Sequence, residues 1–303
     1  MFGQSSYKGK RGSMVNKFKL NAGEFLVKVL ADPAVDKKVQ VREVVYARVG
    51  KKKMKADVVT YEGVEPRRFV LYVHGGGFVS GFKETRTFLC GEFAKHGYLV
   101  FNIDYLLAPH ADMRAIFDNI RDALAYMEVL AEVYRIPKEF CISGDSAGGH
   151  IASLLCGIMG NPKAKEYFRI PDGMKLVSMV NICGSYDIRS AYNSEFKEIK
   201  SFFKAVTHMS ESEILSSASD LYSPAKYDIS KFPPTFVVNA EKDPLRGEGD
   251  KLFDALSGAG VPCERYTGRG VFAVHCFLLF PYFRESRIGL EKCFDFLKQL
   301  QER

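Results

Sequence analysis

Short apolar segments alternate along the chain with longer segments of helical periodicity. This rhythm predicts an α/β fold with a mostly parallel sheet, because parallel strands need crossover helices that cover both faces. The apolar segments are nearly continuous, as strands buried on both faces require. The expected strands cover residues 69–73, 98–103, 140–143, 176–182, 235–239 and 263–266. The expected helices cover residues 113–134, 147–159, 248–259 and 285–300.

Other segments fall outside this rhythm. Residues 39–49 and 56–62 flank a lysine-rich run and predict an antiparallel hairpin with a solvated tip at residues 51–55. An amphipathic segment precedes this hairpin, and a polar-aromatic insertion follows the fourth expected strand of the sheet. Insertions beyond strand ends commonly cover the site in this architecture. We therefore expect an N-terminal tail and cap helix over 1–38, a catalytic core over 39–184 and 228–303, and a cap insertion over 185–227.

Composition narrows the class of protein. With 303 residues, 47% of them apolar, the chain can form one large α/β domain. Lys8, Lys10 and Arg11 supply three of the seven net positive charges, and no broad basic stripe with interleaved aromatics follows. We therefore expect no nucleic-acid partner. The longest apolar stretch, residues 271–283, is interrupted by His275 and Pro281, so no membrane span is expected.

The cysteines and the first residues bear on the compartment. Seven cysteines are scattered without the spacing of a metal site, and the polar first residues do not form a secretory signal. These features predict a cytoplasmic protein with reduced, mostly structural cysteines. They leave the oligomeric state open, with a homodimer as one option.

The strongest chemical signal is FCISGDSAGG at residues 140–149, which contains Gly-x-Ser-x-Gly between an expected strand and an expected helix. In so tight a turn, the positions two before and two after the nucleophile cannot carry a side chain, and Gly144 and Gly148 stand there. The helix from Ala147 directs its free N–H groups to the place where an oxyanion forms. Ser146 is therefore the predicted nucleophile.

A second signal, HGGGF at residues 74–78, directly follows the first expected strand of the core. Three glycines let the backbone approach a ligand and present N–H groups to it. The spacing of a phosphate-binding loop is missing. We predict that Gly76, Gly77 and Ala147 form an oxyanion hole. We expect loop support or pocket lining from His74, Gly75, Phe78 and Asp145.

A serine nucleophile needs a base, and the base needs an orienting carboxylate. Among the six histidines, His275 follows the last expected strand and gives the chain order Ser, acid, His. His110 is expected in a loop that can line the site. For the acid, Asp243 follows the strand at residues 235–239, and Glu241 is its rival. Glu248 and Asp250 are expected in the solvated first turn of the next helix.

Together these segments resemble the hormone-sensitive-lipase-like family of α/β-hydrolases. The resemblance runs from about Arg68 to the C-terminus. It rests on HGGGF (74–78), DYLLAP (104–109), GDSAGG (144–149), SP (223–224), FPPT (232–235), DPLR (243–246) and HCF (275–277). It implies an eight-stranded sheet, a helical cap and hydrolysis of esters with short acyl chains. A plant hormone receptor of this family has lost the catalytic histidine, whereas His275 is present here.

Several positions depart from the family pattern. The family usually has Arg at Leu106, an acidic residue at His110 and Asp at Gly247, and it has Gly-Met-x-His-Gly-Phe where this chain has FAVHCF at residues 272–277. None of these changes removes Ser146, Asp243 or His275. They concern substrate preference and indicate a distant branch of the family.

The predicted reaction is two-step acyl transfer on a small-molecule ester. This reaction requires no metal or other cofactor. Aromatic residues of the cap segments are expected to pack over the strand ends and roof the site, which favours short-to-medium acyl groups. An amide or peptide hydrolase of the same fold is one alternative, because it shares the acyl-enzyme. A non-catalytic small-molecule binder is the alternative from another class of protein.

Overall fold

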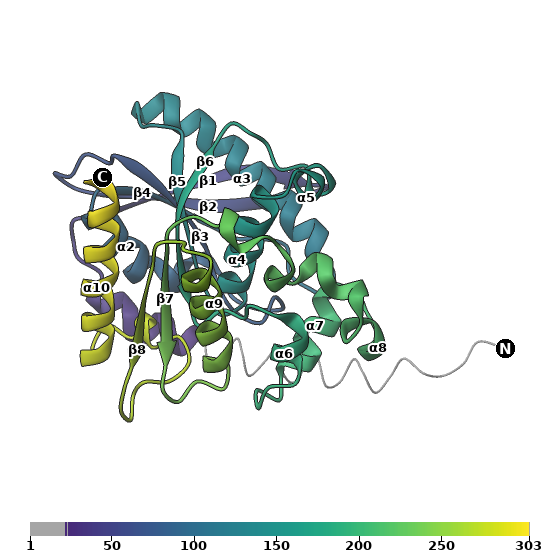
Figure 1. Cartoon of the computed structure of the whole chain (residues 1–303). Helices are drawn as coiled ribbons and strands as arrows, with labels where there is room; N and C mark the ends of the chain where they lie inside the picture. Colours follow the sequence, from purple (N-terminus) through teal and green to yellow (C-terminus); the bar gives the residue numbers. More distant parts are fainter. Residues whose placement is uncertain (1–21, 23, 303) are drawn as a thin grey trace.

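The computed structural model describes residue 22 and residues 24–302, and its centre is one eight-stranded sheet (Figure 1). Its strands lie in the order β1-β2-β4-β3-β5-β6-β7-β8. The two pairs β1–β2 and β2–β4 are antiparallel, and every pair from β4 to β8 is parallel, which confirms the mostly parallel sheet. The strands are β1 Val39–Val49, β2 Lys52–Tyr61, β3 Arg68–Val73, β4 Tyr98–Ile103, β5 Glu139–Asp145, β6 Lys175–Ile182, β7 Thr235–Ala240 and β8 Cys263–Gly268.

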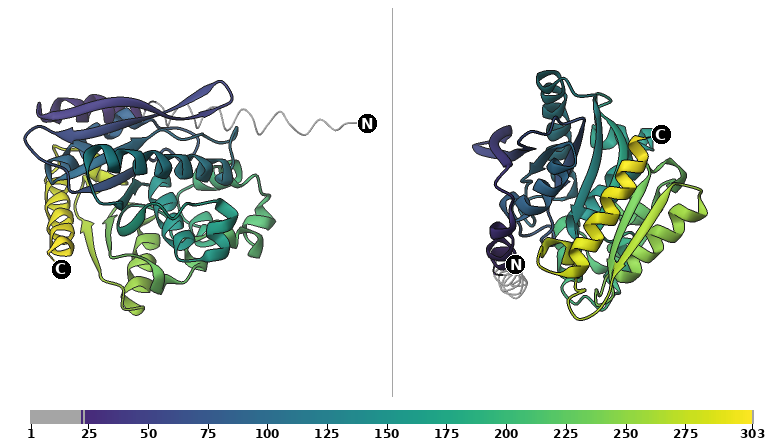
Figure 2. Two further views of the ribbon diagram at one scale, coloured as in Figure 1. Left: turned by 90° about the horizontal axis from the view of Figure 1, so that it is seen from above. Right: turned by 90° about the vertical axis from the view of Figure 1, so that its left-hand side faces the viewer.

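Helices cover both faces of the sheet, and Figure 2 lets the arrangement be followed from two sides, with α10 in yellow. On one face, α2 (Thr87–Lys95) and α10 (Arg284–Gln301) pack against residues such as Val70 and Tyr72. On the other face, α3 (Met113–Tyr134), α4 (Ala147–Met159) and α9 (Arg246–Gly258) share a core with Phe69 and Leu71. Neighbouring residues of β3 therefore enter opposite cores, which explains its continuous apolar sequence.

The predicted helices at residues 113–134 and 147–159 are confirmed with the same bounds. The Asp112 side chain caps α3 by accepting from the N–H of Ala115. Arg135 ends α3 in the left-handed conformation, with a φ of 55°. A short helix, α5 (Pro162–Phe168), follows α4.

Two expectations about the sheet are wrong. The lysine-rich run is not a five-residue tip, because Lys52 already opens β2 and Met54 is buried within it. Met54 pairs with Ala47 of β1, and the pairing of the hairpin continues to Val49 and Lys52 at its turn. Strand β8 is also not buried on both faces, because it lies at the edge of the sheet and leaves Glu264 and Arg265 exposed.

We refer to residues 24–38 and 185–227 as the cap segments. The first contains a helix at residues 24–31 and the 3₁₀ turn η1 (Asp32–Ala34). In the second, α6 (Ile188–Tyr192), α7 (Ile199–Thr207) and α8 (Glu211–Ile214) lie together at one side of the molecule (Figure 1). The remaining 3₁₀ turns are η2 Lys83–Arg86, η3 Ser217–Tyr222, η4 Pro224–Lys226, η5 Ile229–Lys231 and η6 Phe277–Leu279.

The expected tail at residues 1–13, and residues 14–21 and 23 of the expected cap helix, lie outside the described residues. Across residues 24–302, none of the helices combines the length and the apolar character that crossing a bilayer requires. All seven cysteines are free; six are buried, and Cys263 is half-buried.

Candidate active site

Ser146 occupies the turn between β5 and α4, with a φ of 54°. A positive φ is uncommon for a residue with a side chain, and close packing maintains it here. A Cβ on Gly148 would lie 1.9 Å from the carbonyl oxygen of Val73, and one on Gly144 would lie 2.4 Å from the carbonyl carbon of Gly148. The two glycines therefore allow the turn that projects Ser146 from the sheet.

His275 lies between the side chains of Ser146 and Asp243. Its Nε2 is 2.8 Å from the Ser146 Oγ, and its Nδ1 is 2.8 Å from the Asp243 Oδ2. The other Asp243 oxygen accepts from the N–H of Leu245 at 2.8 Å. An ionised carboxylate only accepts, so Nδ1 carries the proton and Nε2 is left to accept from the Ser146 hydroxyl.

Burial and charge oppose each other in this pair. Burial lowers the pKa of His275, but the facing Asp243 carboxylate outweighs it and raises the pKa above its ordinary value. Burial raises the pKa of Asp243, but His275 and the Leu245 N–H outweigh it, so this pKa is lowered. Asp243 is therefore ionised at neutral pH, and its charge favours an imidazolium at His275.

The glycine-rich loop after β3 lies beside Ser146. Gly76 and Gly77 have φ values of 110° and 61°. A Cβ on Gly76 would lie 2.3 Å from the carbonyl oxygen of Ser80, and one on Gly77 would lie 2.7 Å from the Phe202 ring. The loop therefore has no room for side chains there, and its backbone borders the cavity that Ser146 lines.

His74 is buried beneath this loop. Its Nδ1 donates to the carbonyl of Gly75 at 2.7 Å, and its ring stacks on Tyr105 with 4.3 Å between the ring centroids. Burial lowers the His74 pKa, so the ring is neutral at neutral pH. These contacts agree with a supporting position for His74. Phe78 follows the glycines with a φ of 65°, and it packs near His150 and Phe203.

A cavity of about 290 Å³ opens above Ser146 and His275. Both cap segments reach it: Leu26 and Val27 come from the N-terminal helix, and Phe196 and Phe202 come from the insertion. Cys276, Leu279 and Phe280, which follow His275, complete its apolar wall. The apolar lining suits an apolar group bound next to a reactive serine.

The sequence predicted that the aromatic residues of the N-terminal segment pack over the site, and for Phe25 this prediction is wrong. Phe25 is 65% exposed, whereas its neighbours Leu26 and Val27 line the cavity. The helix lies at the surface: Leu26 is 54% exposed as well, although it lines the cavity, and only Glu24 and Ala31 of residues 24–31 are buried. In the insertion, by contrast, Tyr192 and Phe203 are fully buried.

A buried ionic network lies next to Ser146, and the sequence did not predict it. Arg86 donates through Nε and Nη2 to the two oxygens of Asp145, at 3.0 and 2.6 Å. Its guanidinium also pairs with Glu24 of the N-terminal helix. The Tyr72 hydroxyl donates to Asp145 at 2.9 Å. Asp145, expected as a support, therefore joins the turn of Ser146 to a cap segment.

The charges of this network stabilise one another. Burial raises the pKa of Asp145, but Arg86 outweighs it and lowers this pKa below its ordinary value. Burial likewise disfavours the Arg86 cation, but Asp145 and Glu24 raise its pKa well above the ordinary value. All three groups are 9% exposed or less. Sequence offered no local signal for them, because Glu24 and Arg86 are 62 residues apart.

The rivals of Asp243 lie elsewhere. Glu241 is exposed and accepts from the N–H of Gly270 at 2.9 Å. The expectation of a solvated Glu248 is wrong: it is 3% exposed and accepts from the N–H groups of Tyr186 and Asp187 at 3.2 and 2.8 Å. Helix α9 begins at Arg246, so Glu248 lies in its first turn. The Glu248 side chain points inward there and binds the start of the cap insertion.

The remaining four histidines each have other contacts or positions, and the first of them, His96, donates through Nδ1 to the carbonyl of Glu92 at 2.8 Å. His110 is exposed and does not line the 290 Å³ cavity, contrary to expectation. Burial lowers the pKa of His150 to about 4, so it is neutral. It then donates through Nε2 to the carbonyl of Tyr222 and accepts at Nδ1 from the Ser185 hydroxyl. The His208 ring contacts the carbonyl of Pro109.

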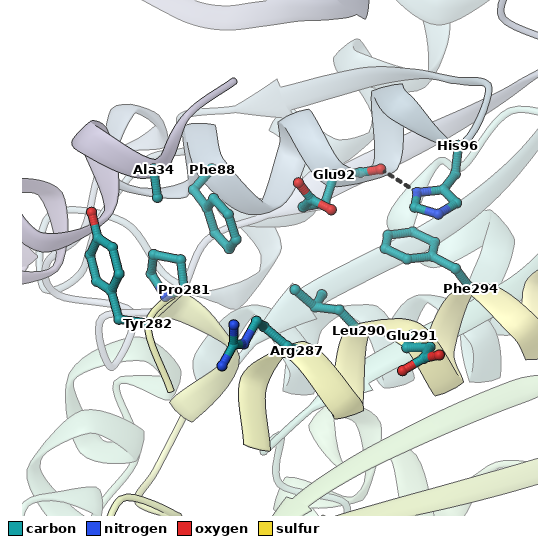
Figure 3. A pocket seen from close by; sticks show the side chains of 10 residues that line it. All are labelled: Ala34, Phe88, Glu92, His96, Pro281, Tyr282, Arg287, Leu290, Glu291 and Phe294. Carbon is teal, nitrogen blue, oxygen red and sulfur yellow. Dashed lines mark hydrogen bonds between the residues drawn. The ribbon is translucent and has the colours of Figure 1, made fainter. Parts of the chain in front are cut away.

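A second and larger hollow, of about 420 Å³, lies between α2 and α10 (Figure 3). Phe88, Leu290 and Phe294 line it together with the charged residues Glu92 and Arg287. Among the described residues that line it there is no serine or cysteine. Chemistry rather than volume therefore identifies the 290 Å³ cavity as the candidate active site.

Known proteins share this architecture. A model of the alpha/beta hydrolase fold family matches residues 70–279. Carboxylesterase NlhH of Mycobacterium tuberculosis is 28% identical over 201 residues, which cover 64% of this chain and 62% of that relative. Versiconal hemiacetal acetate esterase of Dothistroma septosporum is 28% identical over 248 residues, which cover 75% of this chain and 71% of that relative.

A solved structure of an inhibited esterase B from Lactobacillus rhamnosis matches with a TM-score of 0.82 and 18% identity, over 98% of this chain and 97% of that one. At this identity the likeness concerns the fold. The family match spans most of the sheet, from Val70 within β3 to β8, and it includes the turn of Ser146 and the loop of His275. The chain therefore belongs to the α/β-hydrolase fold family.

Proposed function

We propose that this protein is a serine carboxylic ester hydrolase that acts on short-to-medium acyl esters. The observation that carries the proposal is the pair of 2.8 Å hydrogen bonds that joins Ser146, His275 and Asp243 below an apolar cavity. Two relatives named as a carboxylesterase and an acetate esterase support the ester as the substrate class.

In the first step, the Ser146 oxygen attacks the ester carbonyl while His275 Nε2 takes the hydroxyl proton. Asp243 holds the imidazole in the required tautomer and stabilises the imidazolium. The imidazolium then protonates the departing alcohol, and an acyl-enzyme remains on Ser146. In the second step, His275 activates a water that releases the acid and regenerates the serine.

The oxyanion of each tetrahedral intermediate needs hydrogen-bond donors. The N–H groups of Gly76, Gly77 and Ala147 are the proposed donors, because both glycines border the cavity and Ala147 opens α4. The first N–H groups of a helix have no partner within the helix. Each such donor contributes about 2.7–4 kcal/mol to the transition state in other enzymes.

The cap segments argue for short-to-medium acyl groups. Each buried CH₂ of an acyl chain contributes about 0.8 kcal/mol until the cavity is full. Phe196 and Phe202 then stand in the way of a longer chain. We expect kcat/KM to peak at short-to-medium acyl esters and to fall for long-chain ones, without a rate increase at a lipid–water interface.

An organophosphate and a Ser146→Ala variant test the proposal. The wild-type protein should be labelled stoichiometrically, and the variant should lose at least about 1,000-fold in kcat/KM with an unchanged circular dichroism spectrum. A panel of p-nitrophenyl esters and anilides identifies the substrate class. Faster turnover of anilides would indicate an amide hydrolase, and the absence of labelling would indicate a binding protein.

A further inference from the structure

We propose that Cys183, Cys276 and His275 form a binding site for a thiophilic divalent cation such as Zn²⁺, beside Ser146. One ligand atom of each residue, the two Sγ atoms and a ring nitrogen, lies within 4.8 Å of the other two. The sequence spacing hides this site, because Cys183 precedes Cys276 by 93 residues. The fold joins them by placing the end of β6 beside the loop of His275.

The backbone holds both cysteines in place. Cys183 follows β6 with a φ of 53°, and Cys276 precedes η6 with a φ of 56°. The N–H of Cys276 donates to the Cys183 sulfur at 3.4 Å. Each residue is 6% exposed or less, so its surroundings restrict its side chain. The donor atoms are therefore preorganised rather than gathered from mobile loops.

Two thiolates and one imidazole are a donor set that suits Zn²⁺ and Co²⁺. Zinc bonds of about 2.3 Å to sulfur and 2.0 Å to nitrogen place tetrahedral donors roughly 3.5–4 Å apart, so small side-chain shifts suffice. On binding, each thiol releases its proton to solvent, and the two thiolates neutralise the cation. Asp243, which already contacts Cys183, keeps an acidic group beside the cation.

The cavity provides an entry path, because Cys276 and His275 both line it. The cation also has a consequence for catalysis. His275 uses one ring nitrogen for Ser146 and the other for Asp243. Whichever nitrogen binds the cation loses its present hydrogen bond, so an occupied site removes the general base. This consequence rests on the proposed function, whereas the binding does not.

Cobalt titration of the full chain, with a non-thiol reductant present, tests the binding. We expect one equivalent of Co²⁺ and the near-ultraviolet absorption of thiolate–cobalt bonds. Cys183→Ser and Cys276→Gly should each weaken binding at least about tenfold, a loss seen even for changes around metal ligands. Glycine suits position 276 because its φ is positive. Cys263→Ser, which removes a half-buried thiol outside the site, should bind like the wild type.

Hydrolysis gives the second readout. Zn²⁺ should inhibit the wild type and Cys263→Ser. Cys183→Ser and Cys276→Gly should each need at least about tenfold more Zn²⁺ for half-inhibition of their own metal-free rates.

Cobalt binding without thiolate absorption, or equal binding by all variants, would overturn the site. If the variants do not fold, Zn²⁺ should slow the alkylation of both wild-type cysteines by a small reagent such as iodoacetamide, and an unchanged rate would overturn the site. Stoichiometric cobalt binding by a protein whose metal-free form hydrolyses no ester would instead contradict the proposed function, and it would leave the binding site supported.

Discussion

At the residue scale, Asp243 and Glu241 show how two carboxylates of one loop come to differ. Both follow β7, and sequence order alone leaves them as rivals. The Asp243 side chain is fully buried and faces His275, whereas Glu241 is exposed and holds the backbone at Gly270. The direction of each side chain depends on the turn after β7, whose geometry no local pattern specifies.

Asp243→Asn should lower kcat by orders of magnitude, because an amide does not hold the imidazole tautomer. It should also move the acid limb of the kcat/KM profile to lower pH. The proposed reaction needs neutral His275, and Asp243 is the group that raises the His275 pKa. Initial rates across the pH range measure both effects. Glu241→Gln is the matched control and should be mild on both counts; reversed results would mean that the acid is misassigned.

At the scale of elements, α7 of the cap insertion borders the space above the glycine-rich loop. Its Phe202 ring lies against Gly77 and lines the cavity, and Phe203 beside it is fully buried. The sequence predicted that aromatic residues of the insertion cover the site, because such residues are seldom left in water. It did not indicate which ring faces the cavity, since α7 was not separated from its loops.

Phe202→Ala should raise the kcat/KM ratio of a longer acyl ester to an acetyl ester by about 4-fold or more for each additional CH₂ that the cavity accepts, since each buried CH₂ contributes about 0.8 kcal/mol. A series of p-nitrophenyl esters measures this ratio. Leu215→Ala, at a half-exposed site in the same insertion, is the control and should leave the ratio unchanged. The same ratio in both variants would contradict the assigned position of the cap.

At the scale of the whole molecule, the sequence predicted the sheet, the turn of Ser146 and the loop of His275. These features follow from local rules: apolar runs, required glycines and chain order. The network of Glu24, Arg86 and Asp145 was not predictable in this way. The partners of a buried ion pair do not recur at a regular spacing along a sequence. A lone Arg is therefore predicted to be a surface residue, because Arg is rarely buried without a partner.

Arg86→Met should destabilise the protein by about 3–5 kcal/mol, because it leaves the buried Asp145 carboxylate without its cation. The loss should shrink as pH falls: without Arg86 the folded-state pKa of Asp145 rises above its unfolded value, so protonation relieves the cost. Urea unfolding at several pH values measures this effect. Arg121→Met, which removes surface ion pairs with Asp118 and Asp122, should cost about 1 kcal/mol or less at any pH.

Six of the seven cysteines are buried, so their reactivity toward a thiol reagent measures how often the surrounding structure opens. A bulky thiol reagent should modify Cys263 rapidly in the native state and reach the other six only when the surrounding structure opens. At low reagent concentration, the slow phase then follows the free energy of opening, and at saturating reagent it follows the rate of unfolding. Rapid native modification of several thiols would instead reveal local fluctuations, and mapping the labelled peptides would locate them.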